Sequence, residues 1–202
     1  MSALAGKAGA IYVWDGNASQ ALTDEACTDS GDHQTYFITD DTKRYFDINV
    51  AVTVEVDASP VTNFSVVHAG GRIIFDSALA GTETVTVSAN YFTLEQQAGF
   101  ANWSIDSSVD FGDITAFEDS GWKRILPTLK EFSVSAERYW GNGVFFTRDT
   151  LYALALYVDY SNDYRYDCYA YLNGDSIECP VDDIVSESIE FTGHGILSYN
   201  VE

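Results

Sequence analysis

The sequence predicts an all-β or β-rich domain, built as a sandwich or barrel with little helix. Apolar and polar residues alternate with a period of two through much of the 202-residue chain. The composition also favours strands, since 13 Tyr, 12 Phe and 4 Trp accompany many Val and Thr. No segment shows a 3.6-residue apolar stripe of helical length, although short helical turns are expected at Gly121–Leu126 and Asn142–Arg148.

Alternation is clearest in three segments, Val50–Val56, Val85–Tyr91 and Phe132–Glu137, and each is expected as a half-buried strand. Leu151–Asp159 is apolar on both faces, which is typical of a central or sandwiched strand. Shorter strands are expected at Ala10–Trp14, Thr35–Thr39, Asn63–Val67, Arg72–Phe75, Ala101–Ile105, Tyr164–Leu172, Ile189–Phe191 and Ile196–Val201. Turn signals at Ser161–Asp163 and Asn173–Asp175 separate the later strands.

The chain is long enough for one domain, or for one domain with an inserted lobe. We expect a main body formed by residues 1–22 and 95–202, and an inserted β lobe formed by residues 23–94. The lobe would begin with a polar, acidic linker, Thr23–His33, and end before a second polar link, Glu95–Gly99.

Charge is distributed unevenly along the chain, whose formal net charge is −21. The window Gly121–Arg148 holds five of the 10 basic residues and only two acidic ones, Glu131 and Glu137. Such acidity opposes attraction to nucleic acid or to an anionic membrane, yet an acidic wall would let DNA pass by repelling it. The basic window and the acidic remainder could attract each other between copies, so the sequence raises the question of whether the copies assemble.

Three cysteines, Cys27, Cys168 and Cys179, form no disulfide framework. Cys168 and Cys179 would pair only if they faced each other on a hairpin, and reduced thiols fit a protein made in a cytoplasm better. The N-terminus lacks the apolar core of a signal peptide, and the longest apolar run, Leu151–Val158, is too short to span a bilayer.

Motifs for catalysis are missing from the sequence. His33, His68 and His194 lie at no metal-binding spacing, and there is no nucleophile elbow, P-loop or dinucleotide fingerprint. Acidic pairs such as Asp40–Asp41 and Asp182–Asp183 fit solvated loops better than calcium sites. We therefore expect no catalytic, cofactor-binding or metal-binding residues; a hydrolase with a spatially assembled site around His194 is the last alternative.

Six tyrosines, at positions 157, 160, 164, 166, 169 and 171, could form a stacking platform for sugars. This gives an alternative function, a carbohydrate- or receptor-binding β-sandwich of a virion or cell surface. The same tyrosines would also suit half-exposed strands or a subunit interface.

The segment Phe111–Leu126 combines turn formers, charges and aromatic residues, which favours a long loop that docks onto a partner. Our candidate inter-subunit contact residues are Phe111, Asp113, Phe117, Trp122, Lys123, Arg124, Leu126 and Lys130.

This region resembles the major tail tube proteins of long-tailed, siphovirus-like bacterial and archaeal viruses. In that family an acidic, glycine-containing loop leads into a G-W-[KR]-x-x-[LI]-P-x-L-[KR] run and a Ser-rich strand; here the run is GWKRILPTLK at Gly121–Lys130. The lead-in Ala5–Gly9, the strand Trp103–Asp106 and the closing strand Val185–Leu197 with its F-x-G-x-G also resemble the family. The loop departs from the usual G-D-D/G, with Glu118-Asp119-Ser120-Gly121 before the tryptophan.

The resemblance covers residues 1–22 and about 95–202, and less specifically the lobe. It implies a non-enzymatic virion protein without cofactor, made in the host cytoplasm and located in the tail. Six copies would form a ring, and rings would stack into a hollow tube through which DNA passes without specific binding. The implied partners are further copies, the tape measure, the tail terminator and the distal tail protein, and no membrane. A flexible tail is favoured over a contractile one.

Overall fold

The structure, a computed structural model, describes residues 9–116, 121–139 and 146–200. Its regular elements within these residues are β-strands and two single-turn 3-10 helices, η2 (Asp41–Lys43) and η4 (Tyr160–Asn162), so the predicted β-rich class is confirmed. The strands form two seven-stranded sheets, and the chain divides into two compact units.

One sheet lies entirely in the first unit, which comprises residues 1–98, 151–169 and 194–202. Its strand order is β5-β4-β8-β2-β3-β7-β6, with antiparallel pairing throughout. It packs around the buried side chains of Ile38, Phe46, Ile73 and Val87. Its strands are β2 (Gln20–Asp29), β3 (Thr35–Ile38), β4 (Thr53–Val56), β5 (Ser59–Val61), β6 (Phe64–Val67), β7 (Arg72–Phe75) and β8 (Val85–Tyr91).

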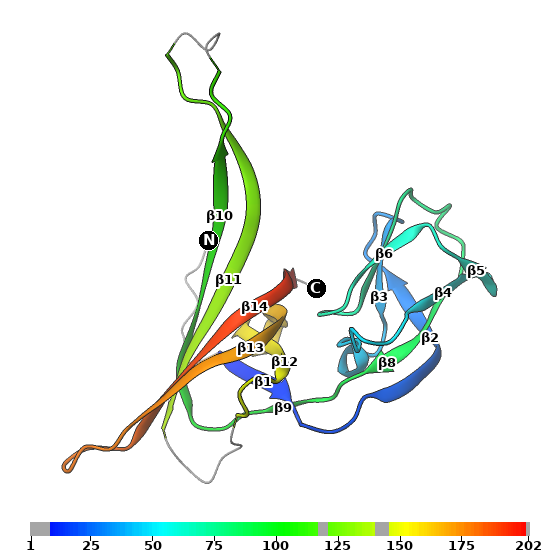
Figure 1. Cartoon of the computed structure of the whole chain (residues 1–202). Helices are drawn as coiled ribbons and strands as arrows, with labels where there is room; N and C mark the ends of the chain where they lie inside the picture. The colour runs from blue at the N-terminus through cyan, green and yellow to red at the C-terminus, as the bar shows by residue number, and fades with distance from the viewer. Residues whose placement is uncertain (1–8, 117–120, 140–145, 201–202) are drawn as a thin grey trace. The chain divides into compact units, whose positions relative to one another are not determined.

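The other sheet has the strand order β10-β11-β14-β13-β12-β1-β9. Its strands are β1 (Ala10–Trp14), β9 (Leu94–Gln96), β10 (Phe100–Asp113), β11 (Ile125–Tyr139), β12 (Leu151–Asp159), β13 (Tyr164–Glu178) and β14 (Ser186–Asn200). The all-apolar β12 lies between β13 and β1, as its sequence predicts. The second unit, residues 99–150 and 170–193, holds β10, β11 and the adjoining parts of β13 and β14 (Figure 1).

Several expected boundaries are wrong. The predicted linker Thr23–His33 is mostly strand β2, whose polar side chains obscured the strand because neither of its faces is strongly buried. No helical turn occurs at Gly121–Leu126, since β11 begins at Ile125. The strand expected from Val50 begins only at Thr53. Residues 140–145 of the second expected helical turn lie outside the described residues. The division into a main body and an inserted lobe stays a prediction.

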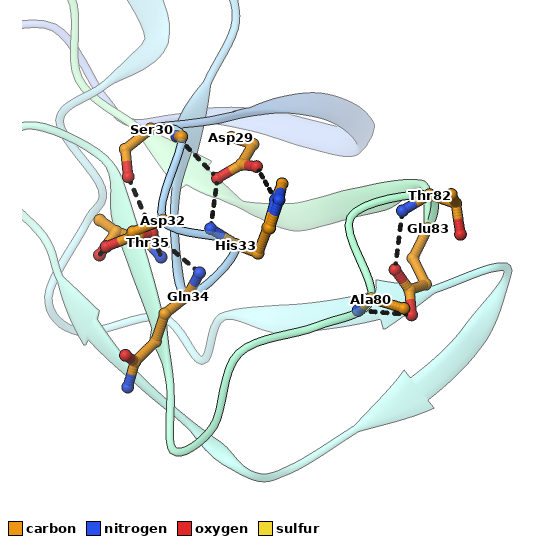
Figure 2. Close-up of polar contacts among 10 residues, drawn as sticks. Asp29, Ser30, Asp32, His33, Gln34, Thr35, Ala80, Thr82 and Glu83 are labelled. Carbon is orange, nitrogen blue, oxygen red and sulfur yellow. Dashed lines mark hydrogen bonds and ion pairs between the residues drawn. The ribbon is translucent and has the colours of Figure 1, made fainter.

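The turn from β2 to β3 shows how this acidic chain uses its carboxylates (Figure 2). Asp32 accepts hydrogen bonds from the backbone N–H groups of Gln34, at 2.8 Å, and Thr35, at 2.6 Å. Asp29 accepts from the N–H of His33 at 3.0 Å and also contacts the His33 ring. Across the same view, Glu83 accepts from the N–H groups of Ala80 and Thr82. These acids satisfy loop backbone groups and stabilise tight turns.

A buried arginine joins separate segments of the first unit. The side chain of Arg165 is 2% exposed, and its Nε donates to Asp167 Oδ1 at 3.0 Å. Tyr45 donates its hydroxyl to the same carboxylate at 2.6 Å, and Arg165 also pairs with Asp163. Burial opposes the charge on Arg165, but Asp167 and its neighbours outweigh this and keep the pKa of the guanidinium above its ordinary value.

The three cysteines are free thiols. Cys168 is buried in β13, whereas Cys179 is exposed after the end of the same strand, so the two do not pair. Burial, with a smaller contribution from Glu25, raises the pKa of Cys27 to about 12.

Candidate interaction surface

Strands β10 and β11 extend as a two-stranded ribbon beyond the rest of their sheet. β14 pairs with β11 only from Ser133↔Thr192 to Tyr139↔Ser186, whereas the β10–β11 pairing continues to Asp113↔Ile125. We call the part formed by Ser108–Asp113 and Trp122–Glu131 the β10–β11 ribbon; it belongs to the long green hairpin in Figure 1. A two-stranded ribbon without further packing is only marginally stable in water.

The ribbon exposes large apolar side chains. Trp122 is 79% exposed and Leu129 73%, and Phe111, Ile125 and Leu126 are each more than half exposed. Nearer the sheet on the same strand, Phe132 and Val134 are buried. Exposed apolar groups gathered in this way, and flanked by charges, are typical of a protein–protein interface.

The two faces of the ribbon differ in chemistry. Val109 pairs with Lys130 and Phe111 with Pro127, so these four side chains share one face. That face continues the buried face of the sheet, where Ile105 lies opposite Val134. The apolar face of the sheet therefore continues onto the ribbon, where it is exposed.

The opposite face is polar and acidic except at Leu126, which lies on it opposite Gly112. Ser108 donates its hydroxyl to Glu131 at 2.9 Å, and period-two alternation puts Asp106 and Asp110 on the same side. A register irregularity between Val109 and Phe111 leaves two residues of β11, Thr128 and Leu129, opposite one residue of β10.

Hydrogen bonds hold the outer end of the ribbon. Thr115 donates its N–H and its hydroxyl to Asp113, at 3.0 and 2.7 Å, and accepts from the N–H of Arg124 at 2.9 Å. Lys123 lies 3.8 Å from Asp113, with both side chains exposed. The hydrogen bonds from Thr115, with the charge of Lys123, hold the pKa of the Asp113 carboxyl below its ordinary value.

Not all five basic residues of the window Gly121–Arg148 contribute positive charge to the exposed ribbon. Arg138 is buried and pairs with Glu187, and Arg148 pairs with Asp175 at 2.8 Å. Lys123, Arg124 and Lys130 are the exposed bases that remain on the ribbon. We call the run Trp122–Lys130, which contains these bases and no acid, the basic limb.

The structure brings most of the candidate contact residues together on this ribbon. Phe111, Asp113, Leu126 and Lys130 lie on its paired strands, and Trp122, Lys123 and Arg124 lie just before β11. Phe117 lies outside the described residues. The expected long loop is wrong in extent, because β10 continues to Asp113 and β11 begins at Ile125. That these residues contact another subunit stays a prediction.

Sequence reasoning missed Val109, Ile125 and Leu129 on the ribbon, although each lies in an alternating pattern beside the named residues. It also missed a second exposed hairpin. β13 continues through the expected turn at Asn173–Asp175 to Glu178, and the chain reverses only at Cys179–Val185.

A glycine at the base of the ribbon explains part of the closing F-x-G-x-G motif. A methyl group on Gly193 would lie 2.5 Å from the ring of Phe132, so only glycine lets that ring pack against β14. Gly195 has φ +79, a left-handed conformation that favours glycine.

The tyrosine series does not form one platform. Tyr169 is buried and donates to the Phe46 carbonyl at 2.6 Å, while Tyr166 packs against Tyr199. Tyr157 and Tyr160 instead join Tyr12 from β1 in a cluster whose ring centroids lie 5.1–5.7 Å apart. These three rings, with Tyr45 and Arg165, line a pocket of about 250 Å³.

A second cleft, of about 380 Å³, is lined by His68 and His194 with mainly apolar neighbours such as Ile48 and Tyr169. Burial lowers the pKa of His68, and the charge of Asp47 opposes this. The described residues that line it include no serine, cysteine or carboxylate. Among the described residues, no three His, Cys, Asp or Glu side chains gather as metal ligands.

No helix in the described part of the chain is long and apolar enough to cross a membrane.

Solved structures that resemble this chain include two from gene transfer agent particles. No family model matches the chain, and neither does any curated protein. The tail of an empty gene transfer agent particle with C6 symmetry is 16% identical, with a TM-score of 0.46 over 54% of this chain and 87% of the other. A chain of the virion of a native gene transfer agent particle is 17% identical, with a TM-score of 0.42 over 54% of this chain and 89% of the other. At these scores the likenesses do not assign a function.

Proposed function

We propose that this protein is the structural subunit of a viral tail tube. Copies form six-membered rings, and the rings stack into a hollow tube through which DNA passes without specific binding. The tape measure, tail terminator and distal tail proteins are its other partners. The observation that carries the proposal is the β10–β11 ribbon: its basic limb is the run that resembles tail tube proteins, and it exposes Trp122, Leu126 and Leu129.

Charge supports the same function. A tube that releases DNA needs a wall that does not bind phosphates, and a net charge of −21 provides repulsion over most of the surface. Stacked rings also need two different, complementary ends, because a heterologous contact repeats along an axis. The exposed bases of the basic limb supply one such end.

The test is negative-stain electron microscopy of the purified chain, with light scattering on the same sample. We expect rings or hollow, regularly striated tubes in the wild type. Trp122→Ala and Lys123→Glu should reduce polymerisation while the circular dichroism spectrum stays unchanged. A compact, stable trimer would contradict the proposal, and full-length tubes in both variants would contradict the role of the ribbon alone.

The tyrosine cluster favours a second candidate, a carbohydrate-binding module. Tyr12 and Tyr160 stack at 5.7 Å beside the 250 Å³ pocket, an arrangement suited to the apolar face of a sugar ring. This function requires a stable monomer or trimer and a glycan affinity that Tyr160→Ala removes. Glycan array binding by the wild type, lost in that variant, would favour it over the tube.

A further inference from the structure

The hairpin that joins β13 to β14 is as exposed as the β10–β11 ribbon but has the opposite charge. Its segment Asn173–Val185, which we call the acidic turn, carries Asp175, Glu178, Asp182 and Asp183 and no basic residue. It also exposes apolar side chains: Ile177 and Ile184 are more than half exposed, and Val181 is fully exposed.

The two hairpins leave opposite ends of the same sheet. β11 leaves its pairing with β14 at Ser133↔Thr192 and continues towards Ile125. At the other end of that pairing, Tyr139↔Ser186, β14 begins, and the acidic turn lies immediately before it, ending at Val185. Figure 1 shows the green and orange hairpins extending in opposite directions. The basic limb of one copy is therefore far from its own acidic turn.

The chemistry of the two segments is complementary. The basic limb presents Lys123, Arg124 and Lys130 with exposed apolar neighbours, and the acidic turn presents four carboxylates with apolar neighbours of its own. Arg148 already pairs with one of these carboxylates, Asp175. Glu178, Asp182 and Asp183 lie beyond that pair, towards the end of the hairpin.

The two strands of the ribbon differ in charge, and only one of them would attract the acidic turn. The β10 strand carries Asp106, Asp110 and Asp113, which would repel the acidic turn. Lys123 lies near Asp113, but at 3.8 Å between exposed side chains this pair is weak and leaves the lysine accessible. The basic limb is thus the part of the ribbon that attracts an acidic partner.

We propose that the basic limb of one copy docks onto the acidic turn of another copy. This inference rests on the proposed function and names the surface that receives the ribbon. Because the basic limb and the acidic turn differ and lie at opposite ends, the contact is heterologous. An open chain of docked copies therefore always keeps one free basic limb and one free acidic turn, at which further copies can add. The apolar side chains of both segments become buried in the contact, surrounded by ion pairs.

Charge reversal with rescue tests the pairing. The full chain is prepared as the wild type, as Lys123→Glu with Arg124→Glu, as Asp182→Lys with Asp183→Lys, and as the combination of all four changes. Asp76→Lys, an exposed acid in the first unit, is the control for a change of net charge. Light scattering over a dilution series gives the critical concentration of assembly, and circular dichroism checks the fold.

We expect each double reversal to raise the critical concentration at least about tenfold, and the fourfold variant to return close to the wild type. The control should assemble as the wild type does, and salt should weaken wild-type assembly as it screens the ion pairs. Unchanged assembly in both double variants, or no rescue in the fourfold variant, would overturn the proposal.

The exposed thiol of Cys179 allows a direct test, because it lies within the acidic turn. Thr128→Cys places a second, exposed thiol on the basic limb without changing Trp122 or a basic residue, and a short bis-maleimide joins the two thiols if they meet between copies. We expect a ladder of covalent multimers on a denaturing gel, absent in Thr128→Cys with Cys179→Ser and in the wild type. Only monomers, or dimers without higher species, would contradict a head-to-tail contact.

The outcomes separate the two proposals. Tubes in the wild type without the ladder or the rescue would refute the docking and leave the tail tube standing. A wild type that stays monomeric at every concentration, or a stable trimer, would refute the tail tube and the docking together.

Discussion

The regions around Arg165 and Trp122 differ in whether the chain itself provides the partners that their side chains need. In the first unit, a buried arginine is enclosed by Asp167, Asp163 and Tyr45 of the same chain, and its charge is satisfied internally. On the ribbon, Trp122 and its apolar neighbours extend into solvent. The first region is complete in one copy. The second exposes apolar area that an internal partner would normally cover, and the proposed docking of another copy would bury it.

The largest loss of stability should come from removing the buried carboxylate that pairs with Arg165. Asp167→Asn leaves the buried guanidinium of Arg165 with one half-exposed carboxylate, and should destabilise the chain by about 3 kcal/mol. Asp163→Asn, the same change on that half-exposed partner, should cost less than about 1 kcal/mol. Urea unfolding measures both. Equal effects would mean that burial does not set the strength of this ion pair.

Strand β11 contains both a buried apolar residue, Val134, and an exposed one, Leu129, so the two can be compared within one strand. Val134→Ala removes buried methyl groups and should lower the free energy of unfolding by about 2 kcal/mol. Leu129→Ala removes an exposed side chain and should change it by less than about 0.5 kcal/mol, yet should impair assembly. Urea unfolding and light scattering on both variants give the two readouts. A large stability loss in Leu129→Ala would place that side chain in the folding core.

The base of the ribbon is tested by Gly193→Ala. The added methyl would lie 2.5 Å from the Phe132 ring, so the ring must shift, at a cost of about 1–3 kcal/mol. Combining it with Phe132→Leu should recover part of the loss in thermal unfolding. If Gly193→Ala leaves the melting temperature unchanged, the close packing of Phe132 on β14 is not required.

Thiol reactivity compares the buried and exposed regions without any mutation. At neutral pH a maleimide should label Cys179, whereas Cys27, with its pKa raised to about 12 by burial, and the buried Cys168 should react only after unfolding. Peptide mapping by mass spectrometry identifies the labelled site. Rapid labelling of Cys168 in the folded chain would contradict its burial.

The smallest effect concerns the outer end of the ribbon. The pKa of Asp113 is lowered on folding, so its bonds to Thr115 should be fully present above the ordinary aspartate pKa of about 4 and be lost as the pH falls through the lower folded value. The Thr115 amide resonance should follow this titration by NMR, and stay flat in Asp113→Asn. A midpoint at or above pH 4 would contradict the hydrogen-bonded turn.

The sequence by itself determined the class of the fold, because period-two alternation reports which strand face meets a core. The central position of β12 followed from its two apolar faces. The mixture of aromatic and basic residues also made Gly121–Lys130 a candidate contact segment, and that contact stays a prediction.

Tertiary structure decided what local patterns do not encode. β2 became a strand although it is polar, because β8 and β3 pair with its backbone. Arg138 lies in the basic window but adds no charge to the exposed surface, because it forms a buried ion pair with Glu187, which is distant in sequence. The acidic turn emerged only because β13 continues past Asn173 and Gly174, whose turn propensity is weaker than the pairing of two long strands. Long-range pairing fixed which charges reach the surface, and at which ends of the sheet they lie.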